Sequence, residues 1–334
     1  MDNNHDDGQD WQPCASREML QARAQLLTQI RQFFTARNVL EVETPVLSQA
    51  GTTDPNIESF QTRFEGPGLP LGQSLYLATS PEFHMKRLLA AGSGDIFQIS
   101  RVFRQTEFGR WHNPEFSLLE WYRIGFDLPA LMDEVSQLVS QLLAPEHNLQ
   151  ATEFITYREA FQRHLALEPF TATTAQLQQC ADSLRIGVSG LGIDDHDAWL
   201  DVLMSHCVQP RLGKEGLCFV YDYPATQAAL ARLRAGVLPP VAERFELFID
   251  GIELANGFHE LEDAEQQLQR FSRDLELRRQ RGLSAVPIDR RLIDALYNGL
   301  PDCSGVALGL DRLLQCKFGT KALHECLAFP LDRA

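Results

Sequence analysis

Two glutamates are placed to hold a cation on one face of a predicted β-hairpin. Two apolar segments flank Asp250-Gly251, a dipeptide that is typical of a tight hairpin turn. With the turn at these residues, Phe248 pairs with Glu253, and the alternation of side chains brings Glu246 and Glu253 onto one face, ~7–8 Å apart at the backbone. Phe248 and Ala255 share this face and give it an apolar floor.

The chemistry that fits this pair is cation binding. Two carboxylates so close together raise each other's pKa unless a metal ion or a hydrogen-bond donor neutralises them. Mg²⁺ prefers oxygen ligands and shares substrate phosphates, so it is the expected ligand of Glu246 and Glu253. The alternative is that both glutamates lie on a solvated face of the sheet.

A second group of polar residues lies at the tip of another predicted hairpin. Arg104 ends a strand and points into the loop, which contains Arg110, His112 and Asn113 and is followed by Phe116. A guanidinium group suits a phosphate or acyl-phosphate oxygen, and an aromatic ring suits a purine. The alternative is a basic, solvated turn without a ligand.

The third candidate is the segment GVALGLDR, residues 305–312. Gly309 allows a ligand to approach the backbone closely, and Arg312 falls in the first turn of a predicted helix. A cation is disfavoured there by the helix dipole unless it serves an anion or a ring. The chain contains neither GxxxxGK[ST] nor GxGxxG, so the P-loop and dinucleotide folds are not indicated.

These residues are positioned by alternating helices and hairpins. Ser16 is the predicted N-cap of a first helix whose apolar spacing includes one polar exception, Arg23. Hairpins and intervening helices without a repeated βαβ pattern favour an α+β fold with an antiparallel sheet. The other predicted elements are extended residues around Pro45, a strand near 74–79, a helix at 82–92, strands at 95–104 and 115–124, mainly helical stretches at 128–145 and 156–235, strands around the turn at 250–251, a polar helix after 261, and a final strand and helix at 301–319.

Composition limits the class of protein. The 334 residues carry a net charge of −15, which disfavours a phosphate backbone as partner. No segment reaches the ~20 apolar residues of a membrane helix, and the acidic start differs from a signal peptide, so we expect a cytoplasmic protein with no membrane partner. The seven cysteines form no CxxC pair and are expected to be reduced thiols, mostly in the core.

Taken in order, these pieces resemble the signature motifs of class II aminoacyl-tRNA synthetases. The Pro45 segment resembles motif 1, FRQTEFGRWHNPEF motif 2 and GVALGLDRL motif 3. The segments TSPEFHMKRLL, NPEFSLLEWYR and GIELANGFHEL are similar to the lysyl branch, and the resemblance covers about residues 16–330. It implies the class II catalytic fold, an antiparallel sheet flanked by helices, with ATP and Mg²⁺ in the reaction.

The start of the chain bears on the acceptor. Lysyl-tRNA synthetases carry an anticodon-binding barrel before the catalytic domain, whereas here motif 1 begins within the first few dozen residues. We expect a polar tail at 1–15 and a single catalytic domain at 16–334, without an anticodon-binding domain. In this the chain is similar to the family of synthetase paralogues that activate (R)-β-lysine as an adenylate and transfer it to a lysine ε-amine of elongation factor P. That resemblance implies elongation factor P, not tRNA, as the partner.

The resemblance also implies roles for individual residues. Arg104 and Arg312 are the expected catalytic residues, and Glu246 and Glu253 the metal ligands, in agreement with the hairpin geometry. For the amino-acid pocket, Glu260 is expected at the side-chain ammonium and Glu82 at the other amine. The predicted ATP-binding residues are Arg104, Gln105, Thr106, Glu107, His112, Asn113, Phe116, Glu253, Leu254, Gly309 and Arg312, and the predicted substrate-binding residues are Ser80, Pro81, Glu82, Tyr122, Glu260 and Ala307.

Two positions depart from the family pattern. Motif 2 normally has a glutamate that accepts from the adenine amino group, but here Thr106 stands there and Glu107 follows. Either backbone groups replace the glutamate or a local bulge lets Glu107 do so. The other departure is Ala307, where lysyl-tRNA synthetases usually have glycine; its methyl group is expected to disfavour an α-amino acid and to suit a β-amino acid.

Two other functions are compatible with the same motifs. One is a free-standing lysyl-tRNA synthetase-like enzyme that uses α-lysine, and the other is a catalytically inactive paralogue that only binds an amino acid. The negative net charge disfavours the first, and the presence of Arg104, Arg312 and the three acids at 246, 253 and 260 disfavours the second. The family also dimerises through motif 1, and the apolar 26–47 segment is compatible with a homodimer.

Overall fold

The chain divides into two compact units in a computed structural model that describes residues 11–144, 149, 152–187 and 195–334. The first unit comprises Met1–Glu120, Asp263–Leu300 and Gly309–Ala334, and the second comprises Trp121–Glu262 and Pro301–Leu308. Of the predicted tail at 1–15, residues 1–10 lie outside the described part. Cys14 and Ala15 donate backbone hydrogen bonds to Ala328 and Leu327, so the chain is fixed to the first unit from there on.

The first unit combines helices with two groups of strands. Strand β1 (Leu40–Glu41) pairs in parallel with β5 (Ile96–Phe103), which lies next to β6 (Glu115–Ile124). A separate antiparallel sheet has the order β2 (Leu47–Ser48), β4 (Gln73–Leu77) and β3 (Gln61–Phe64). The helices are α1 (Arg17–Thr35), α2 (Glu82–Ala90), α7 (Ala264–Gln280), α8 (Arg290–Gly299) and α9 (Leu310–Phe318), with short turns η4 (Leu323–Cys326) and η5 (Leu331–Arg333).

Helix α1 begins where the sequence predicts. The Ser16 hydroxyl accepts the backbone N–H of Met19 at 3.2 Å and so satisfies one of the open donors of the first turn. Its buried side chains follow helical spacing, and Phe34 stacks on Phe97 of β5 with ring centroids 4.5 Å apart. This packing fixes α1 against the strand that leads to Arg104.

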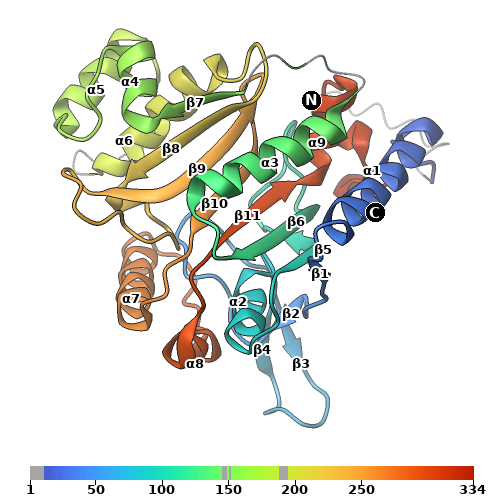
Figure 1. The fold of residues 1–334 in the computed structure, drawn as a ribbon. Helices are drawn as coiled ribbons and strands as arrows, with labels where there is room; N and C mark the ends of the chain where they lie inside the picture. Colours follow the sequence, from blue (N-terminus) through green and yellow to red (C-terminus); the bar gives the residue numbers. More distant parts are fainter. Residues whose placement is uncertain (1–10, 145–148, 150–151, 188–194) are drawn as a thin grey trace. The chain divides into compact units, whose positions relative to one another are not determined.

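A buried arginine on α7 fixes the loop between β2 and β3. Arg278 is 1% exposed, donates to the carbonyl oxygens of Asp54 and Ile57, and pairs with the Glu58 carboxylate at 2.7 Å. The Glu58 carbonyl in turn accepts the backbone N–H of Gln105, the residue after Arg104. The hydrogen bonds of Arg278 and of the Glu58 carbonyl therefore set the position of the backbone where the Arg104 loop begins. Helix α7 also contacts α8, as does α2 (Figure 1).

The second unit is built on a sheet with the order β6, β11, β10, β9, β8 and β7, of which β6 contributes its second half. The pairs from β11 to β8 are antiparallel, and β7 is parallel to β8. The strands are β7 (Glu153–Thr156), β8 (Cys218–Pro224), β9 (Val241–Ile249), β10 (Ile252–His259) and β11 (Cys303–Gly309), and the helices are α3 (Leu128–Leu143), α4 (Tyr157–Leu165), α5 (Thr174–Ser183) and α6 (His196–Leu203), with turns η1 (Met204–Val208), η2 (Gln209–Arg211) and η3 (Ala225–Gln227).

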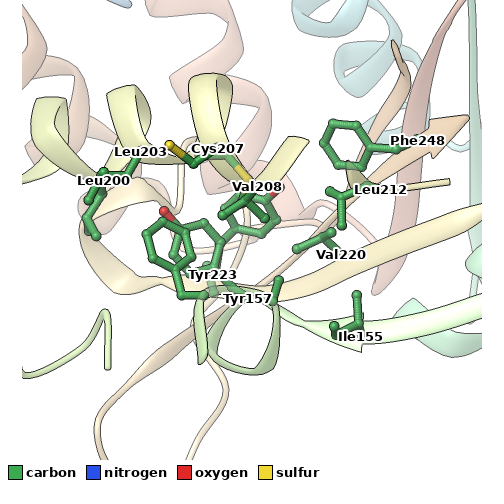
Figure 2. Packing of buried hydrophobic residues seen from close by; sticks show 14 of the residues in the cluster. Ile155, Tyr157, Leu200, Leu203, Cys207, Val208, Leu212, Val220, Tyr223 and Phe248 are labelled. Atoms are coloured by element: carbon green, nitrogen blue, oxygen red, sulfur yellow. The ribbon is translucent and has the colours of Figure 1, made fainter. Parts of the chain in front are cut away.

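The stretch 156–235 is less helical than the sequence predicts, because β8 lies within it. Helices α4 and α6 and the π-helical turn η1 pack on the face of β8 and β9 that carries Val220 and Phe248 (Figure 2). Tyr157, Tyr223 and Phe161 form part of this core, with the Tyr157 and Tyr223 rings 4.9 Å apart. The segment thus adds both a strand and a hydrophobic core to the second unit.

The hairpin register follows the sequence at the turn and departs from it further along. Asp250 and Gly251 both have positive φ, of 49° and 77°, and Phe248 faces Glu253 as predicted. The register then shifts between Glu253 and Ala255, so Glu246 faces Asn256 and Ala255 faces Leu247. The prediction that Ala255 shares a face with Glu246 is therefore wrong, because a β-bulge adds one residue to β10.

The α+β fold class is confirmed, and the cysteines are free, with Cys207, Cys218, Cys303, Cys316 and Cys326 buried. In the described part of the chain, no helix has both the length and the apolar character that crossing a membrane requires.

A buried histidine is held between two acids at the end of β10. His259 is 2% exposed, its Nε2 lies 2.7 Å from Asp302 and its Nδ1 lies 3.2 Å from Glu243. Burial works against the charged imidazolium, but the hydrogen bonds to Glu243 and Asp302 outweigh it and raise the pKa of His259. The hydrogen bond to His259, together with Arg232, lowers the pKa of Glu243 to about 2.

The contacts of His259 with Glu243 and Asp302 predict how the free energy of unfolding depends on pH. Because the pKa of His259 is raised above the ordinary 6.5, the stabilisation that His259 provides is fully present below pH 6.5. It is lost as the pH rises through the pKa of His259 in the folded state. The contribution of Glu243 is present above 4.5 and is lost as the pH falls towards about 2.

We expect the difference in unfolding free energy between the wild type and a His259→Asn variant to shrink from about pH 6 to about pH 9 in urea titrations. The exposed His206→Asn substitution provides a control, since its effect should not follow the same pH profile. A difference for His259→Asn that stays constant over this range would contradict the prediction.

Candidate active site

In the first unit, acidic side chains lie next to Ser80, just before α2. The Ser80 hydroxyl donates to the Glu120 carboxylate at 2.5 Å and accepts the backbone N–H of Glu82 at 3.0 Å. Glu82 pairs with Lys86 one turn later at 2.6 Å, and Lys86 is 2% exposed. Two of the predicted pocket residues, Ser80 and Glu82, therefore lie together, and Pro81 lies between them as the N-cap of α2.

Glu120 is a candidate site residue that the sequence interpretation missed. It is buried on β6 and is bonded to Ser80. The signal was available, because Glu120 precedes the predicted pocket residue Tyr122 by two positions and a strand places such residues on one face.

The predicted ATP-binding loop between β5 and β6 is closed by a hydrogen bond from the backbone N–H of Arg104 to the Pro114 carbonyl, at 2.8 Å. The Arg104 guanidinium pairs with Glu107 at 3.1 Å and lies 5.1 Å from the centroid of the Phe116 ring. Gln105 and Thr106, in contrast, are exposed. The loop thus brings a cation and an aromatic face together, as binding a nucleotide phosphate and base requires.

The pairing of Glu107 bears on the choice between Thr106 and Glu107 for adenine. The Glu107 carboxylate is engaged by Arg104, so contacting adenine would require it to exchange that partner. Asn113 is also engaged, since its amide donates to the Glu115 carbonyl at 2.6 Å and accepts from Leu331 at 3.1 Å.

Helix α9 presents the second predicted catalytic arginine. Gly309 is its N-cap, and Arg312 lies in the first turn with a guanidinium nitrogen 2.6 Å from His112 Nε2. His112 comes from the β5–β6 loop, so the two predicted ATP-binding segments of the first unit contact each other. The neighbouring Asp311 is buried and turns away from this contact towards Arg23 and Ser117.

In the second unit, Glu246 is buried on β9. Its carboxylate accepts from the Tyr223 hydroxyl at 2.6 Å and from the Arg244 guanidinium at 2.5 Å. The pKa of Glu246 is raised to about 7, chiefly by burial and further by the charge of Glu253, while Arg244 and the Tyr223 hydroxyl oppose the increase. The predicted pair of acids is therefore close enough to interact.

These residues fit a Mg²⁺ ion shared with phosphates. Glu246 and Glu253 supply hard oxygen donors whose mutual repulsion a cation would relieve. Among the described residues, no group of three or more His, Cys, Asp or Glu side chains could hold a metal ion. Two protein carboxylates suit a metal ion that takes its remaining ligands from substrate and water. Leu254 is the residue at the bulge beside them, and its side chain is buried.

Arg244 and Asn256 also belong to this face and were missed. Arg244 donates to the Asn256 side-chain oxygen at 3.1 Å and lies 4.5 Å from the centroid of the Tyr223 ring. The alternation of side chains along β9 could have indicated from the sequence that Arg244 shares a face with Glu246. Asn256, in contrast, reaches this face only because of the bulge.

The predicted amino-acid pocket of the second unit lies over Gly305. A Cβ atom at this position would lie 2.3 Å from the Tyr122 ring and 2.6 Å from the Glu260 carboxylate, so only glycine leaves room for both. Tyr122 and Glu260 are 3% and 1% exposed, and Ala307 follows on the same face opposite Asn256. A buried acid beside an aromatic ring suits an ammonium group.

Comparison with known proteins places these features in a family. The model of the class II tRNA synthetases (D, K and N) matches residues 10–333. A protein of Salmonella paratyphi A (strain ATCC 9150 / SARB42) named elongation factor P–(R)-β-lysine ligase is 51% identical over 324 residues, which cover 97% of this chain and 98% of that protein. Proteins of the same name from Salmonella arizonae and Pectobacterium atrosepticum are 51% and 50% identical over the same shares of both chains. The chain therefore belongs to the class II tRNA synthetase family, and within it to the family of the elongation factor P–(R)-β-lysine ligases.

Proposed function

We propose that this protein activates (R)-β-lysine with ATP and transfers it to a lysine side chain of elongation factor P. The observation that carries the proposal is the buried carboxylate of Glu260, a predicted amino-acid-binding residue that lies over Gly305 together with the Tyr122 ring. An ammonium group of the substrate needs such an acid. The names of the relatives supply the identity of the amino acid and of the acceptor.

The first step forms an aminoacyl-adenylate. A carboxylate oxygen of the amino acid attacks the α-phosphorus of ATP, the bond to the bridging oxygen of the β-phosphate breaks, and pyrophosphate leaves. Arg104 and Arg312 would stabilise the charge that develops on the phosphate oxygens, and Phe116 would stack on the base. Catalysis then depends on position and electrostatics, without a side-chain nucleophile.

The second step transfers the aminoacyl group. The amine nitrogen of the acceptor lysine attacks the carbonyl carbon of the mixed anhydride, the bond to the AMP oxygen breaks, and the amine loses a proton. The product is an amide on the acceptor protein, with AMP released. Ser80, Glu82 and Tyr122 are proposed to hold the amino acid during both steps.

Mg²⁺ is proposed as the metal of the reaction, held by Glu246 and Glu253. When bound, it would neutralise phosphate charge. Arg244 and Tyr223 hold the Glu246 carboxylate in place by hydrogen bonds. Three further expectations from the sequence stay predictions: a homodimer through the motif 1 segment, no role for tRNA, and a cytoplasmic location.

Isotope exchange between pyrophosphate and ATP tests the proposed first step. We expect exchange that depends on (R)-β-lysine, because adenylate formation is reversible while no acceptor is present. Exchange with α-lysine only would favour the synthetase-like alternative, and no exchange with either amino acid would favour an inactive paralogue.

The acceptor is tested by incubating purified elongation factor P with enzyme, ATP and β-lysine and measuring its mass. The expected result is a mass increase of one β-lysyl group on a single lysine. Unchanged elongation factor P, together with active exchange, would rule out the proposed acceptor.

Substitution of a predicted metal ligand tests the role of Mg²⁺. A Glu253→Gln variant should require at least about tenfold more Mg²⁺ for half-maximal exchange, because an amide lacks the charge that a hard cation prefers. Glu276→Gln on α7, an exposed position, serves as the matched control. The metal assignment fails if the Mg²⁺ dependence of Glu253→Gln matches that of the control.

Ala307 is proposed to set the preference for a β-amino acid. Removing one methyl group from a pocket changes discrimination by about tenfold or more, so Ala307→Gly should raise kcat/KM for α-lysine relative to β-lysine by about that factor. Ala255→Gly, on the opposite face of β10, controls for a looser backbone. An unchanged ratio in the Ala307→Gly exchange assay would refute this role.

A further inference from the structure

Arg23 is the polar residue on the apolar face of α1, and neither the metal nor the substrate proposal uses it. It lies between the buried residues Met19 and Leu26, and its side chain is 15% exposed. Its guanidinium pairs with Asp311, donates to the Cys326 carbonyl at 2.8 Å and lies 3.4 Å from the Ser117 hydroxyl. One cation therefore joins three segments that are distant in sequence.

The first segment carries Arg312. Asp311 has a side chain that is 3% exposed, and both its oxygens are used, one by Arg23 and the other by the backbone N–H of Ser117 at 2.6 Å. Asp311 and Arg312 are consecutive residues in the first turn of α9. Fixing Asp311 therefore fixes the backbone from which Arg312 projects.

The second segment carries the aromatic residue of the nucleotide site. Ser117 follows Phe116, whose ring lies 5.1 Å from the Arg104 guanidinium. Because the Ser117 N–H is bonded to Asp311, the position of Phe116 along β6 is tied to the start of α9. The Arg23–Asp311 pair is thus linked by hydrogen bonds or by chain connection to both proposed ATP-binding segments, the one with Phe116 and the one with Arg312.

The third segment supports the loop between β5 and β6. Cys326 lies in the stretch 321–331, whose Leu323 N–H bonds to the Arg110 carbonyl and whose Leu331 N–H bonds to Asn113. By holding the Cys326 carbonyl, Arg23 holds the stretch that supports this loop from behind.

We propose that Arg23 is a positioning residue for ATP: through Asp311, Ser117 and the Cys326 carbonyl it sets the relative positions of Phe116, Arg312 and the loop that carries Arg104. The inference rests on the proposed function for the role of these three residues. Removing one partner of a buried pair leaves a charge without compensation, here the Asp311 carboxylate next to Arg312 in the first turn of α9. Loss of Arg23 should therefore weaken ATP binding selectively.

The experiment compares Arg23→Met and Arg23→Lys in the full chain. Calorimetry measures the Kd for ATP with Mg²⁺ and no amino acid, and pyrophosphate exchange gives KM for ATP and for β-lysine. We expect Arg23→Met to raise Kd and KM for ATP tenfold or more, with KM for β-lysine within twofold of the wild type. Arg23→Lys, which keeps the charge but not the planar fork, should raise them about threefold.

The matched control is Arg31→Met, which makes the same change on the same helix at an exposed residue that pairs with exposed Glu41. It should leave both KM values within twofold of the wild type. Circular dichroism establishes which variants fold. If Arg23→Met does not fold, the Kd and KM values of Arg23→Lys test the proposal.

The proposal is overturned if a folded Arg23 variant binds ATP like the wild type, or weakens ATP and β-lysine equally. Wild-type protein that binds ATP but shows no exchange would refute the proposed function. The calorimetric comparison would still decide the role of Arg23, because it requires no amino acid.

Discussion

Burying a carboxylate away from water is costly unless a cation or hydrogen-bond donors compensate its charge, and this constraint shapes both units. Asp311 is compensated by Arg23 and a backbone N–H, Glu246 by Arg244 and a tyrosine hydroxyl, and Glu58 by Arg278. The pairs of Asp311 with Arg23 and of Glu58 with Arg278 also join segments of the first unit that are distant in sequence.

The two arginines that are proposed to act on the phosphates, Arg104 and Arg312, both have partners within the protein. Arg104 is bonded to Glu107 and Arg312 lies against His112, so a phosphate bound as proposed would replace these contacts. Such partners keep the guanidinium groups oriented and limit the entropy lost when ATP binds. They would also reduce the gain from each new contact, so ATP binding at the proposed site would depend on geometry more than on charge.

Sequence patterns predicted those parts of the molecule whose cause is local. The turn at Asp250-Gly251 fixed the register near it, and the capped helix at Ser16 and the elements around Arg104 and Arg312 lie where spacing placed them. The bulge in β10 has no such local signal. Because of it, Asn256 lies beside Glu246, where the sequence predicted Ala255. Strand β8 was missed although its aromatic and β-branched residues, in the segment CFVYDYP, carry a local strand signal. Arg23 was visible as an exception, but only the fold identifies Asp311 as its partner.

The bulge in β10 also limits how this hairpin can change in length. Side chains alternate along a strand, so the extra residue is what lets Glu253 and Asn256 point the same way although three positions separate them. Deleting one residue there would turn either the acid or the amide to the opposite face. Insertions and deletions in evolution are therefore expected to spare this hairpin and to accumulate in stretches where no alternation has to be kept.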